Sequence, residues 1–136
     1  PVRRGRRMAR PVAGLTLEDL LEVARRTVGP TVAVRDMGLL SAALARVEAR
    51  ADGRDVYPSA EHRAAALLHS LVTTAPLVQG NRPFAWIATA VYLARLGRPS
   101  SLTDAEAFDL VTDVLIGRLQ TVDAIAERLV DPARER

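Results

Sequence analysis

The chain has 136 residues and a mass of 14.7 kDa, a length typical of one domain, since single domains usually contain about 100 to 200 residues. Hydrophobic residues make up 49% of the sequence and charged residues 26%, which predicts a folded globular protein rather than a disordered chain. No apolar run approaches the ~20 residues that cross a bilayer, so no membrane span is expected. The absence of cysteine excludes disulfide bonds, thiolate metal sites and cysteine nucleophiles.

All 19 basic residues are arginine, because the sequence contains no lysine. This excludes a Walker-type phosphate loop and lysine catalysis. No apolar stretch of signal-peptide length follows the basic start, so we expect a cytoplasmic protein. We divide the chain into a basic flexible arm over residues 1–15, a helical domain over residues 16–130 and a tail over residues 131–136.

The arm concentrates positive charge, since five arginines lie within the first ten residues and leave 14 arginines against 16 acids for the rest of the chain. Its basic residues are Arg3, Arg4, Arg6, Arg7 and Arg10. Such an arm could contact nucleic-acid phosphates, but it contains no aromatic residue and the remainder is slightly acidic. We therefore expect a solvated tail or a site for an acidic partner, and keep a nucleic-acid-associated regulator as an alternative.

Apolar residues spaced three and four positions apart predict helices along the whole chain. Capping residues and Gly or Pro stops set their ends, including capping boxes at Thr16 and Thr103 and an end of the second helix at Asp52-Gly53. The expected helices run over about residues 16–28, 37–50, 59–74, 83–96, 103–117 and 121–130. With no alternating strand pattern, the predicted fold class is all-α, a compact bundle of about six helices.

The fourth of these helices is expected to be central in the bundle and buried on most sides. The third has an inward stripe, and the fourth begins with Pro83 in its first turn, where the missing N–H costs nothing. The expected inward residues are Leu67, Leu68, Leu71 and Val72 in the third helix and Ile87, Ala90, Val91 and Ala94 in the fourth, where Trp86, Tyr92 and Leu93 extend the apolar face. We interpret Phe84, Trp86 and Tyr92 as core residues rather than a stacking platform.

The loop from Ala75 to Arg82 is the most informative segment. Gly80 and Asn81 lie just before a helix, where free backbone N–H groups and the positive end of the helix dipole favour an anion. Arg82 adds a planar charged donor. The loop therefore predicts an anion site, with a plain helix-to-helix turn capped by Asn81 as the alternative.

The loop Ala75-Pro76-Leu77-Val78-Gln79-Gly80-Asn81-Arg82-Pro83 resembles the signature of the Fic/Doc family, H-x-F-x-[D/E]-[G/A]-N-[G/K]-R followed by a helix. It most resembles the Doc (death-on-curing) branch. Residues 35–49 before the central helices and residues 121–126 near the end occur in the same order as in Doc. The resemblance covers about residues 16–130 and implies a Doc-like helical fold around a central Fic-type helix.

The resemblance also assigns roles to single positions. In the family, the histidine deprotonates the target hydroxyl, the acidic residue holds magnesium on the nucleotide phosphates and the final arginine binds phosphate. The matching positions here are Ala75, Gln79 and Pro83, so the resemblance implies that conventional phosphotransfer or AMP transfer is absent. An alanine at the histidine position could be natural or engineered, and the additional changes favour natural degeneration. The expected anion- or nucleotide-binding residues are Gln79, Gly80, Asn81 and Arg82.

Two histidines could in principle replace the missing base. His62 and His69 lie seven positions apart on the third helix and so share a face. We interpret both as ordinary helix histidines and retain His69 as a candidate base. No metal site is expected, since only Glu61 and Asp55 lie near them in the sequence and no spaced cluster exists.

The leading functional hypothesis is a Doc-like, toxin-type module of a toxin–antitoxin system that keeps an anion pocket and lacks the usual transferase activity. The resemblance implies an antitoxin or another protein as partner. A phosphate or a nucleotide is the expected ligand, and no other cofactor is assigned. The main alternative is an enzyme of different chemistry that uses the same pocket for a phosphorylated or nucleotide ligand.

Overall fold

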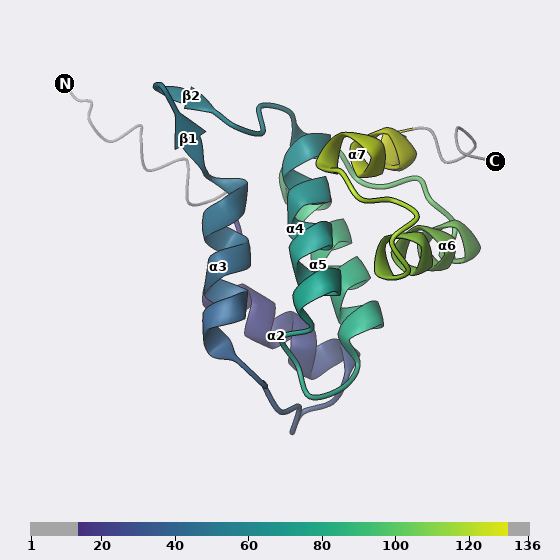
Figure 1. The fold of residues 1–136 in the computed structure, drawn as a ribbon. Coiled ribbons are helices and arrows are strands. Elements are labelled where there is room, and N and C mark those ends of the chain that lie inside the picture. The colour runs from purple at the N-terminus through teal and green to yellow at the C-terminus, as the bar shows by residue number, and fades with distance from the viewer. Residues whose placement is uncertain (1–13, 131–136) are drawn as a thin grey trace.

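The computed structural model describes residues 14–130. Within this range it contains six helices and one short hairpin, so the predicted all-α fold class is confirmed (Figure 1). The elements are α2 Leu17–Thr27, α3 Met37–Val47, β1 Arg50–Ala51, β2 Arg54–Asp55, α4 Ala60–Thr74, α5 Asn81–Arg95, α6 Asp104–Leu115 and α7 Val122–Val130. Almost all of the expected arm and the whole tail lie outside the described residues. No helix of the described part is long and apolar enough to cross a membrane.

Helices α4 and α5 lie side by side at the centre, with α2 and α3 on one side and α6 and α7 on the other (Figure 1). Helix α4 contacts α3, α5, α6 and α7. It is the most buried helix because an unbroken apolar run, residues 64–68, has no accessible surface. Its alanines have short side chains, which lets neighbouring helices approach it from several directions.

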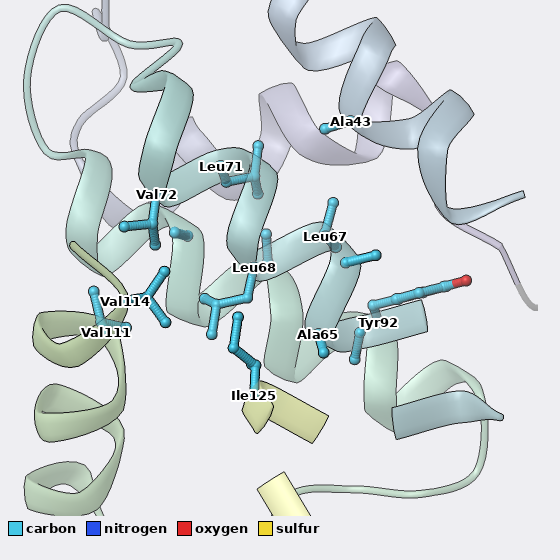
Figure 2. Packing of buried hydrophobic residues seen from close by; sticks show 14 of the residues in the cluster. Ala43, Ala65, Leu67, Leu68, Leu71, Val72, Tyr92, Val111, Val114 and Ile125 are labelled. Atoms are coloured by element: carbon cyan, nitrogen blue, oxygen red, sulfur yellow. The ribbon is translucent and has the colours of Figure 1, made fainter. Parts of the chain in front are cut away.

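The inward residues predicted for α4 are confirmed as core. Leu67, Leu68 and Leu71 are fully buried and Val72 is 4% exposed. Figure 2 shows Val111 and Val114 of α6 and Ile125 of α7 pointing toward this face of α4. The predicted period of the helix therefore identified the residues that join the two sides of the bundle.

The predicted inward face of α5 is wrong at Ile87 and Ala94, which are exposed, whereas Tyr92 and Leu93, expected to extend it, are buried. Ile87 is 39% exposed, and the buried residues of this helix are Phe84, Ala85, Ala88, Thr89, Tyr92 and Leu93. The helix carries apolar residues around most of its circumference, so its period cannot select one face. The side with the small residues Ala85 and Ala88 faces the core, and the Thr89 hydroxyl is satisfied by donating to the carbonyl of Ala85 at 2.8 Å.

The predicted end of the second helix is also wrong. Helix α3 ends at Val47, and the chain then forms the β1–β2 hairpin, in which Arg50 pairs with Asp55. Asp52 and Gly53, which were interpreted as a helix stop, have φ angles of 53° and 76°. Two successive residues with positive φ form the tight turn that suits the twist of an antiparallel hairpin, and Asp-Gly is a common sequence for it.

The helix starts follow the predicted capping chemistry. Thr16 and Thr103 form reciprocal capping boxes with Asp19 and Glu106. Helix α5 begins two residues before Pro83 and has Gly80 rather than Asn81 as its N-cap. Pro83 is therefore the third residue of α5, still in the first turn as predicted.

Candidate functional site

The loop over residues 75–80 joins α4 to α5 and is tied to a segment about 40 residues earlier in the chain. The backbone N–H groups of Arg35 and Asp36 donate to the carbonyl of Pro76 at 2.7 and 3.1 Å. The guanidinium of Arg35 donates from Nε to the carbonyl of Ala75 at 2.8 Å and from Nη2 to that of Thr74 at 2.5 Å. Arg35 thereby satisfies carbonyl groups that the end of α4 leaves without helical partners.

Ala75, which the loop resemblance matches to the histidine of the Fic/Doc signature, ends α4 in a left-handed conformation with φ 49° and ψ 68°. For a residue with a Cβ, this conformation is less stable than the right-handed one by about 1–2 kcal/mol. The hydrogen bonds from Arg35 hold the chain in place around it. Its methyl group is part of the lining of a pocket at the start of α5.

Gly80 is required by its surroundings as well as by its backbone conformation. Its φ is 80°, and a Cβ built on it would lie 2.6 Å from Cγ2 of Val28 at the end of α2. Such a distance is far inside van der Waals contact. The close approach of Gly80 to Val28 therefore sets how the start of α5 packs on α2.

The side chain of Asn81 makes its hydrogen bonds within the loop. Its Oδ1 accepts from the backbone N–H of Leu77 and its Nδ2 donates to the carbonyl of Leu77, both at 2.9 Å. Leu77 is itself buried, with 1% of its surface exposed. No side chain caps α5, so the donors that remain for a ligand are the backbone N–H groups of its first turn, at Asn81 and Arg82, because Pro83 has none.

A pocket of about 450 Å³ lies over this first turn. Its lining residues are Val72, Ala75, Gly80, Asn81, Arg82, Pro83 and Leu115. The structure thus brings together three of the four predicted binding residues, whereas Gln79 is exposed and does not line the pocket. Arg82 is the one charged residue among those that line this pocket.

The structure does not bring His69 to the loop. The Nη1 of Arg46 on α3 donates to His69 Nδ1 at 2.9 Å and to the hydroxyl of Ser70 at 3.0 Å, while Nε of Arg46 donates to the hydroxyl of Tyr57 at 3.1 Å. Burial lowers the pKa of His69 below its usual value, and the charge of Arg46 lowers it further. His69 is therefore a neutral acceptor between α3 and α4 and does not line the loop pocket.

This environment predicts a pH dependence of stability. The folded-state pKa of His69 is lowered, so below about pH 6.5 the unfolded chain binds a proton more readily than the folded protein. The free energy of unfolding should fall as the pH decreases from about 7.5 to 5.5, and part of this loss should be missing in His69→Gln. Urea denaturation of both proteins at the two pH values measures it. Equal losses would contradict the assigned environment.

His62 has a carboxylate partner that the sequence did not reveal. Its Nε2 lies 3.1 Å from Oδ1 of Asp123 on α7, and its Nδ1 lies 2.7 Å from the hydroxyl of Ser59, the N-cap of α4. Asp123 is 61 residues away in the sequence, so no local spacing could have indicated the pair. Across residues 14–130 no group of three or more His, Asp or Glu side chains could hold a metal ion.

Comparison with known proteins gives one close similarity. No family model matches the chain. A segment of 79 residues is 44% identical to Toxin Doc of Mycolicibacterium smegmatis (strain ATCC 700084 / mc(2)155), covering 58% of this chain and 61% of that protein. The matched segment thus spans less than two thirds of the relative's length. The chain is therefore similar to Toxin Doc over this segment, and its helical fold agrees with the Doc-like resemblance of the loop.

Proposed function

We propose that this protein is a toxin-type module of a toxin–antitoxin pair that binds a phosphate-bearing ligand at the loop pocket and does not transfer phosphate or AMP. The toxin-type assignment is supported by the 44% identity to a protein named Toxin Doc. The ligand class is supported by one observation in particular. Arg82 and the uncapped start of α5 line a pocket that contains no acidic residue in its lining.

The absence of transfer follows from the side chains at the pocket. A general base must lie within about 2.6–3.2 Å of the proton that it removes, and the methyl group of Ala75 cannot accept one. His69 is engaged with Arg46 on another side of α4. Gln79 could offer only a neutral carbonyl oxygen to Mg²⁺, which prefers carboxylates. Phosphate can therefore be held by the pocket, whereas its activated transfer lacks the groups that the family uses.

The binding proposal predicts that inorganic phosphate, sulfate and AMP shift the amide resonances of residues 77–84, with the exception of Pro83. Arg82→Ala should weaken this binding by ~1.5–3 kcal/mol, because it removes hydrogen bonds between a cation and the ligand's charge. Arg54→Ala on the exposed β1–β2 hairpin is the matched control and should leave affinity unchanged. Absence of any shift at millimolar ligand would sink the anion pocket.

The partner proposal is tested separately. We propose an antitoxin encoded beside this gene, because the family resemblance implies such a partner. Co-expression of the two proteins should yield a complex that co-purifies through a tag on either chain. If the neighbouring product neither binds nor is required for normal growth of cells that express this protein, the toxin–antitoxin assignment is wrong while the anion pocket can still stand.

A further inference from the structure

An unpartnered apolar face lies on α6, which is at the edge of the molecule away from α2 and α3 (Figure 1). Phe108 is 62% exposed, Leu115 42% and Ile116 60%. These are three of the eight large hydrophobic residues that are exposed among residues 14–130, and they lie within nine consecutive positions. Exposed apolar residues gathered on one helix indicate an interaction surface more than isolated ones do.

The residues of this face have the spacing of a helix-pairing seam. Ala105, Phe108, Thr112 and Leu115 follow one another at intervals of three, four and three positions, the pattern that places side chains along one side of a helix facing a second helix. Thr112 is half-buried, and its hydroxyl oxygen is buried inside the protein. We call the surface formed by these four residues and Ile116 the α6 face.

A groove extends the apolar surface from the α6 face toward α5. It has a volume of about 330 Å³ and lies directly beside Phe108. Its lining residues are Arg82, Pro83, Trp86, Asp104, Ala107, Phe108 and Val111. Trp86 is half-buried, so it packs against the core and also lines this groove. The apolar area thus extends beyond α6 and can receive side chains from a helix lying along it.

The charges at the two ends of the α6 face are opposite. Asp104 is exposed at the first residue of α6. Arg118 follows the last turn; its side chain is 72% exposed, with Nε 3.9 Å from Oδ1 of Asp113. If a second α6 lay antiparallel along the first, each Asp104 would face the Arg118 of the other copy, whereas a parallel arrangement would bring like charges together. Antiparallel helices also align their dipoles favourably.

From this complementarity we propose that the protein forms a two-fold symmetric dimer in which the α6 faces of two copies pack antiparallel. The symmetry axis passes near Thr112, and Phe108 of each copy packs against Ile116 of the other. Such an interface is isologous, because the same patch is used by both subunits. The occupant of the α6 face is thus a second copy of this chain. The pocket over Ala75 is a neighbouring site, because Leu115 belongs to both the α6 face and the pocket lining, and Arg82 lines both the pocket and the groove.

Sedimentation equilibrium of the full chain tests the dimer. The wild type should become dimeric as its concentration rises, and Phe108→Glu should be monomeric because two charges would be buried in the seam. Val56→Glu is the matched control, since Val56 is 45% exposed on the hairpin side of the molecule and should leave association unchanged. A wild type that stays monomeric up to ~1 mM protein overturns the proposal.

The direction of pairing is tested by exchanging charges. Arg118→Asp and Asp104→Arg should each weaken dimerisation about tenfold, because like charges then face each other at both ends. The double variant restores opposite charges and should regain the wild-type affinity. Thermal unfolding of each variant checks that the fold is intact. If the double variant is as weak as the single ones, the antiparallel arrangement is wrong.

Discussion

Replacement of Gly80 with alanine is expected to lower the free energy of unfolding by about 2–5 kcal/mol. The left-handed conformation at this position, with φ 80°, costs a residue with a Cβ about 1–2 kcal/mol. The new methyl group would also lie 2.6 Å from Cγ2 of Val28, and overpacking of this kind costs about 1–3 kcal/mol. Since single domains have only 5–15 kcal/mol of stability, the variant should unfold at a much lower denaturant concentration.

Gly97 provides a closely matched control. Its φ is 79°, and nothing lies within 4 Å of a Cβ built on it. Gly97→Ala should therefore cost only the conformational part, about 1–2 kcal/mol. In a Val28→Ala background the additional cost of Gly80→Ala should largely disappear, which a double-mutant cycle measures. Equal effects of the two glycine substitutions would show that the contact between α2 and the start of α5 is not as close as described.

The second large effect concerns transfer chemistry. The wild-type protein is expected to transfer no measurable phosphate or adenylate from ATP to a protein hydroxyl. Ala75→His alone should change little, although the base is typically worth ~10²–10⁴ in rate, because the metal and phosphate contacts are still missing. The backbone can accept the substitution, since histidine is among the residues enriched in the left-handed conformation of position 75.

The triple variant Ala75→His, Gln79→Asp and Pro83→Arg should transfer phosphate or adenylate from ATP, whereas Ala75→His alone should not. Pro83 lines the pocket, so an arginine there can reach a bound phosphate. Radiolabel from ATP on a protein acceptor measures the reaction, and the triple variant with Arg82→Ala serves as control. Transfer by the wild type that is lost in Arg82→Ala would overturn the proposal that the protein only binds its ligand.

The sequence by itself determined where most helices begin and end. The capping boxes at Thr16 and Thr103, the N-cap Ser59 and the stop after Val28 act within one helical turn. Local hydrogen bonds of this kind depend on residues two to four positions apart, so they can be recognised from spacing alone. The loop was selected as a candidate anion site in the same way, because glycine and asparagine before a helix form a local pattern. The resemblance of its residues to the Fic/Doc signature then led to the functional hypothesis.

The tertiary structure decided which groups meet across the bundle. Ile87 is exposed because the alanine-lined side of α5 packs on the core. A helix with apolar residues all round offers no period that selects a face. The role of Asn81 depends on the carbonyl and N–H of Leu77, whose positions follow from the pairing of the loop with residues 33–36.

The partners of the two histidines were likewise beyond the sequence. His69 meets Arg46 across 23 residues and His62 meets Asp123 across 61. Such contacts are set by how the helices pack, which is decided by the summed burial of many apolar residues. Local spacing thus determined where the helices and the loop lie in the sequence. The packing of α4 against its neighbours determined which side chains line the loop pocket.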